Sequence, residues 1–361
     1  MVEVGKSKAF DSKVTDQYAI YHGDSCVVLP TLPDGSIHLS LYSPPFGGML
    51  YQYSSDPADL SNSKDYAEFF EHYDFIIREL HRLTMPGRMT VVHCTDIFQC
   101  IGGLHSVIDF PGHIIAAHEK AGWTYVARIH IWKEPLTVRN RTMLKSLHHK
   151  TLCEDSTTVS IANADYLCVF RRSGKNPVPV KHPRGLRNYA GSLEIPEEVK
   201  KWKNHKGNQI ENAYSQWIWR QYASSNWHDI RIDRTLGSGA SVYSGNRAAK
   251  DEPDEKHMHP LQLDIIERAC VLWSNPGETV LTPFLGVGSE VYAAVANGRR
   301  GVGIELKPAY YRQAVKNLEA LKDRVASDTE QSLFRVDELA AAEQPEPVAA
   351  EASAAFDWGA E

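Results

Sequence analysis

The segment whose residue types most directly suggest chemistry is Ser43-Pro44-Pro45-Phe46, which follows a strand-like run over residues 37–42. Its two prolines fix φ and remove two backbone N–H donors, so the carbonyl groups of Ser43 and Pro44 can point outward as acceptors. With the Ser43 hydroxyl and the flat ring of Phe46, these acceptors would suit a planar group that carries an NH₂. The competing interpretation is a Pro-Pro turn that only ends a strand.

A second pattern lies far downstream, where a buried strand over 278–284 runs into a glycine turn over 285–289. A helix over 290–297 and a strand over 300–306 follow, and the second strand finishes in a carboxylate, Glu305. Such a βαβ unit binds a ribose-containing cofactor at the carboxyl edge of a parallel sheet, because glycines let the ligand approach and the carboxylate accepts from ribose hydroxyls.

The glycine turn also limits the kind of cofactor. It contains Gly286 and Gly288 but lacks the third glycine of a dinucleotide fingerprint, and no Gly-Lys-Ser/Thr loop is present to cradle a phosphate. A cofactor without a pyrophosphate therefore fits better. The alternative is a glycine turn that serves only tight packing.

Taken together, the two segments resemble the amino-methylating DNA methyltransferases, which use S-adenosyl-L-methionine to methylate adenine N6 or cytosine N4. The catalytic motif of that family, (Asp/Asn/Ser)-Pro-Pro-(Tyr/Phe/Trp), matches residues 43–46, and its cofactor motif, Phe-x-Gly-x-Gly, matches residues 284–288. The catalytic motif comes first, which is the permuted order of the family's beta group. The resemblance covers about residues 18–96 and 257–321 and is looser between them.

The resemblance assigns roles to individual residues. It implies that the catalytic residues are Ser43, Pro44, Pro45 and Phe46. It implies that the cofactor is bound by Asp24, His259, Pro260, Thr282, Phe284, Gly286, Gly288, Ser289 and Glu305. In that scheme Asp24 contacts the adenine of the cofactor, and His259 opens a (Lys/His)-Pro-x-x-Leu segment that leads the cofactor half.

The cofactor motif departs from the family's usual form at two places. Thr282 stands where the family usually has Asp, and Val287 and Ser289 stand within a turn that usually reads Gly-Ser-Gly-Thr. The missing acidic residue normally helps to hold the methionine end of the cofactor. We expect activity to survive these changes.

The resemblance also implies a mechanism. The lone pair of an exocyclic amine is delocalised into the base, and acceptors aimed at its hydrogens localise that lone pair toward the methyl sulfonium. The Ser43 side chain and the Pro44 carbonyl would be those acceptors, and Phe46 would stack on a base rotated out of the duplex. No covalent intermediate is needed, so no cysteine has a catalytic role. We favour cytosine N4 over adenine N6, because Ser in the first motif position is seen more often with cytosine.

The elements that must position these motifs alternate between strands and helices, which predicts an α/β sheet with helices on both faces. The resemblance implies the seven-stranded, Rossmann-like sheet of S-adenosyl-L-methionine-dependent methyltransferases, circularly permuted and with an inserted target-recognition region. We expect strands over 88–93, 124–132 and 165–171 and helices over 65–83, 114–121, 261–273 and 310–325. Four parts follow: a catalytic half (1–172), a target-recognition insertion (173–257), a cofactor-binding half (258–325) and an acidic disordered tail (326–361).

The net charge of −6 is unevenly distributed along the chain. Residues 326–361 hold nine acidic residues and one basic residue, whereas residues 171–206 hold ten Lys or Arg and three Glu. Basic residues neutralise phosphates and interleaved aromatics stack on bases, so the middle third is expected to bind double-stranded DNA. The alternative for its aromatics, which include Trp217 and Trp219, is ordinary packing inside the protein.

The remaining composition excludes other classes of protein. No apolar run approaches the ~20 residues that span a bilayer, so we expect no membrane contact. Six scattered cysteines without a C-x-x-C pair indicate reduced, mostly buried thiols of a cytoplasmic protein. The pairs His93-Cys94 and His148-His149 lack a second ligand pair, so we expect no metal site. The sequence leaves open whether the protein forms a homodimer and whether it has a partner restriction nuclease.

Two other functions fit part of the pattern. Related Pro-Pro-aromatic motifs occur in methyltransferases that act on RNA or on protein amides, but the motif order and the large basic insertion argue against that class. The departure at Thr282 motivates the second alternative, a DNA-binding regulator with a degenerate cofactor site.

Overall fold

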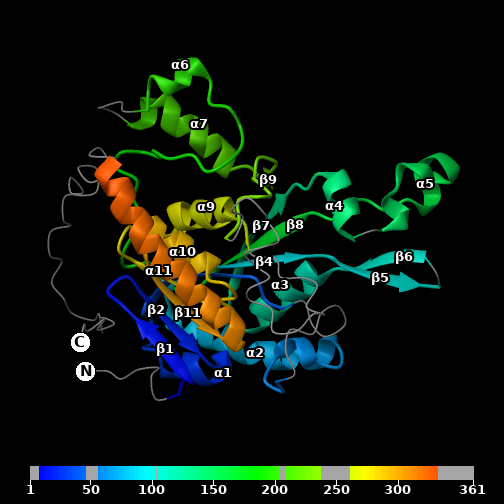
Figure 1. The fold of residues 1–361 in the computed structure, drawn as a ribbon, viewed down its shortest axis with the longest axis horizontal. Helices are drawn as coiled ribbons and strands as arrows, with labels where there is room; N and C mark the ends of the chain where they lie inside the picture. Colours follow the sequence, from blue (N-terminus) through cyan, green and yellow to red (C-terminus); the bar gives the residue numbers. More distant parts are fainter. Residues whose placement is uncertain are drawn as a thin grey trace.

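The computed structural model describes residues 8–45, 56–102, 104–142, 144–203, 209–236 and 261–331. These residues form one nine-stranded sheet with helices on both faces and a separate two-stranded hairpin (Figure 1). Across the sheet the strands are β1 (Asp11–Val14), β2 (Tyr18–His22), β11 (Arg300–Glu305), β10 (Thr279–Thr282), β3 (Ile37–Tyr42), β4 (Thr84–Thr95), β8 (Asp165–Arg171), β7 (Thr124–Ile131) and β9 (Asn226–Trp227).

The sheet is mostly parallel. Strand β1 runs antiparallel to β2, and β8 runs antiparallel to both of its neighbours, β4 and β7. The short strands β1 and β9 lie at the two edges of the sheet and add to the seven strands that the family resemblance implied. The sheet is thus the α/β architecture expected from the sequence, whereas circular permutation stays an inference from motif order.

The two halves of the core meet in the middle of the sheet. Strand β10 pairs in parallel with β3, with Val280 opposite Leu39 and Leu281 opposite Ser40. Strand β11 then pairs in parallel with β2. The carboxyl ends of β2, β3, β10 and β11 therefore lie at one edge, although the strands come from opposite ends of the chain.

Three helices cover each face of this part of the sheet. One face carries α1 (Ser25–Val28), α2 (Tyr66–Leu83) and α3 (Phe110–Lys120), and the other carries α9 (Leu263–Trp273), α10 (Ser289–Ala296) and α11 (Pro308–Gln331). Helix α2 illustrates why the sequence folds this way, because Asp65 caps its first turn by accepting from the Glu68 N–H at 2.9 Å. The apolar residues predicted to form its buried face, from Phe69 to Leu80, recur at helical spacing and are buried, whereas Phe75 points to solvent.

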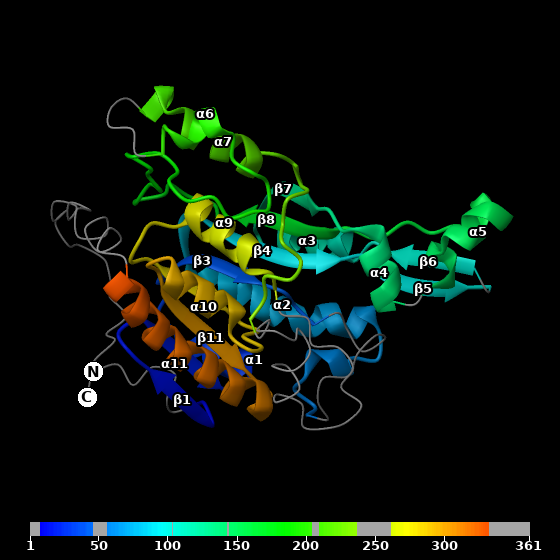
Figure 2. The ribbon, with the colours of Figure 1, turned by 45° about the horizontal axis from the view of Figure 1, so that its top comes forward.

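The structure adds elements that were not expected from the sequence. They are the hairpin strands β5 (Ile97–Ile101) and β6 (Leu104–Ile108) and the helices α4 (Pro135–Thr142), α5 (His149–Glu154), α6 (Glu197–Lys200) and α7 (Ala213–Tyr222). Figure 2 shows α4, α5 and the hairpin projecting together beyond the ends of β4 and β7. Of these elements α6 and α7 lie in the expected insertion, whose described part is thus more regular than its composition indicated.

Helix α7 packs against the core and does not stand apart from it. Tyr214, Ile218 and Tyr222 form a buried cluster that also touches Val271 and Leu272 of α9. These tyrosines therefore have a packing role, whereas Trp219 on the same helix is 58% exposed. The alternative of ordinary packing thus holds for part of the aromatic set.

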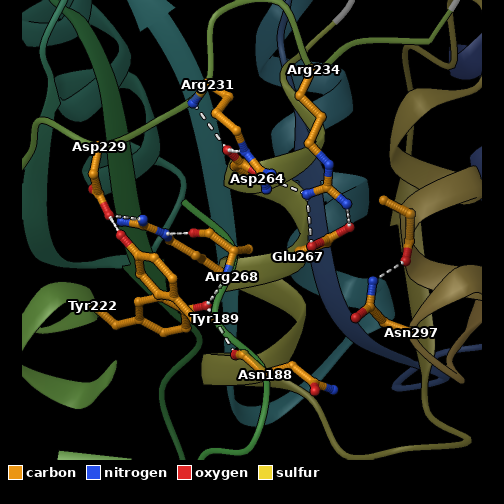
Figure 3. Close-up of polar contacts among 12 residues, drawn as sticks. Asn188, Tyr189, Tyr222, Asp229, Arg231, Arg234, Asp264, Glu267, Arg268 and Asn297 are labelled. Carbon is orange, nitrogen blue, oxygen red and sulfur yellow. Dashed lines mark hydrogen bonds and ion pairs between the residues drawn. The ribbon is translucent and has the colours of Figure 1, made fainter. Parts of the chain in front are cut away.

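A buried ion pair anchors this region to α9. Arg268 is fully buried and pairs with Asp229, which also accepts a hydrogen bond from the Tyr189 hydroxyl (Figure 3). The guanidinium lies over the rings of Tyr222 and Trp227, at 4.7 and 4.9 Å from their centroids. Polar groups this deeply buried stabilise a fold only as a complete set.

Two further arginines hold the next stretch of chain on the same helix. Arg231 donates to the Asp264 carboxylate, with Nε 2.9 Å from Oδ2. Arg234 reaches both Asp264 and Glu267 (Figure 3). We call residues 229–236 the strap, because they run along α9 toward the carboxyl edge of the sheet.

Asp229→Ala should destabilise the protein strongly, because it leaves the Arg268 guanidinium buried without its carboxylate. We expect the free energy of unfolding, measured in urea, to fall by about 3–5 kcal/mol. Asp74→Ala is the control, because it breaks the exposed pair with Arg78 and should cost less than about 1 kcal/mol. Equal losses in the two variants would contradict the anchoring role.

Among the described residues, no helix has the length and apolar character needed to cross a membrane. The same part of the chain holds no cluster of three His, Cys, Asp or Glu side chains that could bind a metal ion. The thiols of Cys94 and Cys168 lie 3.9 Å apart, unbonded, on neighbouring strands.

Candidate active site

A cavity of about 190 Å³ opens at the carboxyl edge of the sheet. Much of its lining comes from the segments that follow four strands: residues 24–26 after β2, 43–45 after β3, 283–287 after β10 and 306–307 after β11. Residues 58–60 and the first residues of α10 and α11 add to it. The double-proline corner and the glycine turn therefore share one cavity, as the sequence required.

Ser43 stands at the inner end of this corner. Its Oγ lies 3.4 Å from Nδ1 of His93, which belongs to the neighbouring strand β4. Pro44 is buried and Pro45 is half-buried, and both line the cavity. The fourth residue of the predicted motif, Phe46, lies outside the described residues.

Behind Ser43 lies a chain of polar side chains that sequence reasoning missed. Nε2 of His93 is 3.2 Å from Oδ2 of Asp165, although the angle is poor for a hydrogen bond, and Nζ of Lys133 is 2.6 Å from Oδ1. Burial alone would raise the pKa of Asp165, but the charge of Lys133 and the contact with His93 outweigh it and lower that pKa. Asp165 is therefore ionised at neutral pH.

These three residues carry no contiguous motif. His93 lies in β4, Asp165 begins the antiparallel strand β8, and Lys133 follows β7, so all three reach the same sheet edge only through strand pairing. Position at a strand end is the one signal that could have found them. In the sequence His93 stood out only as half of a possible metal pair.

The glycine turn requires glycine at two positions because of its backbone conformation. Gly286 has φ +53° and Gly288 has φ +95°, a region that other L-residues rarely adopt. A Cβ on Gly288 would also meet the Cβ of Ala314 at 3.2 Å. The turn thus brings the backbone close to the cavity and starts α10 immediately afterwards.

Glu305, at the end of the neighbouring strand β11, holds the glycine turn through its carboxylate. Its Oε2 accepts from the Gly286 N–H at 2.7 Å, and its Oε1 accepts from the Lys307 N–H at 2.9 Å. Each carboxylate oxygen retains a second lone pair, so Glu305 can still accept hydrogen bonds from a ligand.

The cavity is acidic. Asp24, Asp59, Glu290 and Glu305 line it, against one lysine, Lys307. Burial raises the pKa of Glu290 to about 8 and that of Glu305 to about 7. An acidic cavity whose carboxylates are poorly hydrated fits a ligand that carries positive charge, because the ligand supplies the compensation that water cannot.

Most of the predicted cofactor residues reach this cavity, but not all of them. Asp24, Phe284, Gly286, Ser289 and Glu305 line it. Thr282 and Gly288 do not: Thr282 is fully buried beneath the turn, and Gly288 serves the turn through its backbone. His259 and Pro260 lie outside the described residues, although Leu261, which follows them, lines the cavity.

Sequence reasoning also missed several lining residues. Glu290, at the start of α10, looked like an ordinary acidic residue in a first helical turn. Tyr310 and Lys307 come from the start of α11, and the Lys307 ammonium lies 4.9 Å from the Tyr310 ring centroid. Leu236, the last described residue of the strap, packs with Tyr310 and Val287, both of which line the cavity.

The raised pKa of Glu290 makes the stability of the cofactor-free protein depend on pH. The folded state favours the protonated acid, so this contribution is fully present below the ordinary pKa of 4.5 and is lost as the pH rises through about 8. Glu290→Gln removes the titration. We expect its melting temperature to exceed that of the wild type by a few degrees at about pH 8 and the difference to shrink toward pH 5. A pH-independent difference would contradict the assignment.

Comparisons with known proteins agree with this geometry. A DNA methylase family matches residues 37–316. The type II methyltransferase M.MjaI of Methanocaldococcus jannaschii is 24% identical over 316 residues, which cover 81% of this chain and 88% of that protein. This similarity does not identify the DNA base that the present chain would methylate.

Solved structures share the fold. The putative DNA modification methylase TTHA0409 of Thermus thermophilus, complexed with S-adenosyl-L-methionine, aligns with a TM-score of 0.54 at 21% identity, over 84% of this chain and 95% of that one. The PvuII DNA methyltransferase (cytosine-N4-specific) aligns with a TM-score of 0.53 at 14% identity, over 86% and 92%. Because the family match spans both the double-proline corner and the glycine turn, the chain belongs to the DNA methylase family of N6 and N4 amino-methyltransferases, which use S-adenosyl-L-methionine.

Proposed function

We propose that the protein transfers a methyl group from S-adenosyl-L-methionine to the exocyclic amine of a DNA base rotated out of the duplex, with cytosine N4 as the favoured target. The observation that carries this proposal is the shared cavity, which Ser43 and Pro44 line together with Gly286 and Glu305. An acceptor for an amine and a cofactor turn thus border the same space.

The cofactor supplies an electrophilic methyl group. Glu305 would accept from its ribose hydroxyls, as acidic residues at the end of a second parallel strand commonly do. Asp24 also lines the cavity, and the resemblance implies that it contacts the adenine of the cofactor. The acidic lining suits a ligand whose sulfonium and ammonium groups are both positive.

The polar chain behind Ser43 would orient its hydroxyl. The ionised Asp165 near Nε2 favours a proton on that nitrogen of His93. Nδ1 is then an acceptor for the Ser43 O–H. The lone pairs of Ser43 Oγ, together with the Pro44 carbonyl, remain available for the hydrogens of the target amine, which concentrates the amine lone pair on nitrogen.

The same chain gives the departing proton a route. Once the amine nitrogen has accepted the methyl group, it must lose one proton. His93 Nδ1, reached through Ser43, can hold that proton, and the ionised Asp165 stabilises the resulting imidazolium. Lys133 fixes the carboxylate in place.

For the DNA contact we propose two regions. One is the insertion over 173–257, which begins with the basic stretch of the middle third. The other is the projection formed by α4, α5 and the β5–β6 hairpin, which extends from the sheet edge that holds the cavity (Figure 2). Its basic side chains, which include the half-buried Arg139 and the exposed Lys150, would neutralise phosphates beside the flipped base.

Adenine N6 is the second candidate target, because a neutral hydroxyl acceptor can serve either amine. A catalytically weak DNA-binding regulator is the third candidate, motivated by Thr282. By similarity with the type II methyltransferases we propose a modification enzyme of a restriction–modification pair acting in the cytoplasm, with a partner nuclease.

Ser43→Ala should abolish most of the activity while the cofactor still binds. Loss of an acceptor that aligns the amine should reduce methyl transfer from radiolabelled S-adenosyl-L-methionine to mixed-sequence DNA by at least about a hundredfold. The same is expected of Phe46→Ala, whose ring would stack on the base. Ser36→Ala is the control, because that hydroxyl bonds only to Pro33 within its own turn. Full activity of Ser43→Ala would overturn the catalytic assignment.

The target atom can be identified directly. DNA methylated by the protein is digested to nucleosides, and the modified nucleoside is identified by mass spectrometry. We expect N4-methyldeoxycytidine as the product. N6-methyldeoxyadenosine would establish the second candidate, and the absence of any methylated nucleoside despite tight DNA binding would favour the regulator.

A further inference from the structure

We propose that Glu290 binds the α-amino group of S-adenosyl-L-methionine and replaces the acidic residue that the family's cofactor motif usually carries at position 282. The inference rests on the proposed function, because it concerns the same cofactor cavity. It resolves the departure at Thr282, which otherwise leaves the methionine end of the cofactor without an acidic partner.

The positions of the two residues support an exchange of roles. Thr282 ends β10, is fully buried and does not line the cavity. Glu290 lies on the other side of the same glycine turn, as the second residue of α10, and lines the cavity with only 5% of its surface exposed. In this chain the acidic residue therefore lies at the start of the helix, whereas the family's usual motif has it at the end of the strand.

Glu290 lacks a cationic partner within the described residues. Its carboxylate contacts its own backbone N–H, and the nearest charge acting on it is the like charge of Glu305. The neighbouring Ser289 Oγ is also buried and has no hydrogen-bond partner in the described part of the chain. A buried carboxylate without a cationic partner and an adjacent buried hydroxyl without a hydrogen-bond partner, both lining the cavity, indicate a ligand that brings hydrogen-bond donors.

The other acidic residues of the cavity already accept hydrogen bonds from the protein backbone. Glu305 accepts from two backbone N–H groups and is the proposed partner of the ribose. Asp24 caps α1 by accepting from the Cys26 N–H at 2.8 Å. Asp59 likewise accepts from a backbone N–H, at 2.8 Å. Glu290 is left for the opposite end of the cofactor, where the α-ammonium group offers three donors and a full positive charge, whereas the sulfonium offers no donor.

The test compares three ligands by isothermal titration calorimetry. S-adenosyl-L-methionine carries both the ammonium and the sulfonium, S-adenosyl-L-homocysteine keeps only the ammonium, and 5′-methylthioadenosine has neither. In Glu290→Gln we expect the first two to bind roughly ten- to a hundredfold more weakly, the cost of removing a charged hydrogen-bond partner, while 5′-methylthioadenosine binds as it does to the wild type. Glu71→Gln, an identical change at an exposed position of α2, should alter none of the three affinities.

Each other pattern overturns the proposal. Loss of affinity for S-adenosyl-L-methionine alone would place Glu290 at the sulfonium, and equal losses for all three ligands would mean general damage to the cavity. Unchanged affinities would remove Glu290 from cofactor binding. If the wild type binds none of the three, the proposed function itself fails. Should Glu290→Gln not fold, Glu290→Asp serves, with the same selective loss expected at smaller size.

Restoring the family's arrangement provides an independent measurement. In the double variant Thr282→Asp with Glu290→Gln, the acid returns to the end of β10. We expect it to recover at least part of the affinity for S-adenosyl-L-homocysteine that Glu290→Gln loses. A double variant that folds, as judged by circular dichroism, and binds no better than Glu290→Gln would contradict the exchange of roles.

Discussion

The parallel pairing of β10 with β3 is the constraint on which the site depends. It joins the two ends of the chain in the middle of the sheet, with Val280 opposite Leu39. Parallel strands of this kind end at a common edge, so Ser43 and Gly286 can border one cavity. A slip of one residue in this pairing would turn every side chain of β10 to the other face and break that correspondence.

Much of the fold could be predicted from the sequence because its signals are local. The strand before the Pro-Pro corner, the helical spacing of α2 and the βαβ unit around the glycine turn each depend on neighbouring residues. The short helices α4, α5 and α6 have too few turns to show a period. Helix α7 was missed for another reason, since the aromatics of the middle third were interpreted mainly as nucleic-acid contacts, whereas Tyr214 and Tyr222 pack against α9.

The residues of the candidate site can likewise be divided into those that could be predicted from the sequence and those that could not. Ser43, Gly286 and Glu305 were predictable, because each belongs to a contiguous pattern with a chemical rationale. His93, Asp165 and Lys133 were not, since they meet only after three strands have been paired. Thr282 was assigned to the cofactor from motif position alone, whereas the side-chain directions at the turn bury it and expose Glu290 to the cavity.

The strap has an implication for engineering. Arg231 and Arg234 fasten it to α9, and its last described residue, Leu236, packs against Val287 and Tyr310 in the wall of the cofactor cavity. A segment within the proposed target-recognition insertion thus also forms part of the wall of the proposed methyl-donor site. A chimera that grafts a foreign specificity module here must keep its junction upstream of Asp229, or it will rebuild the donor site as well.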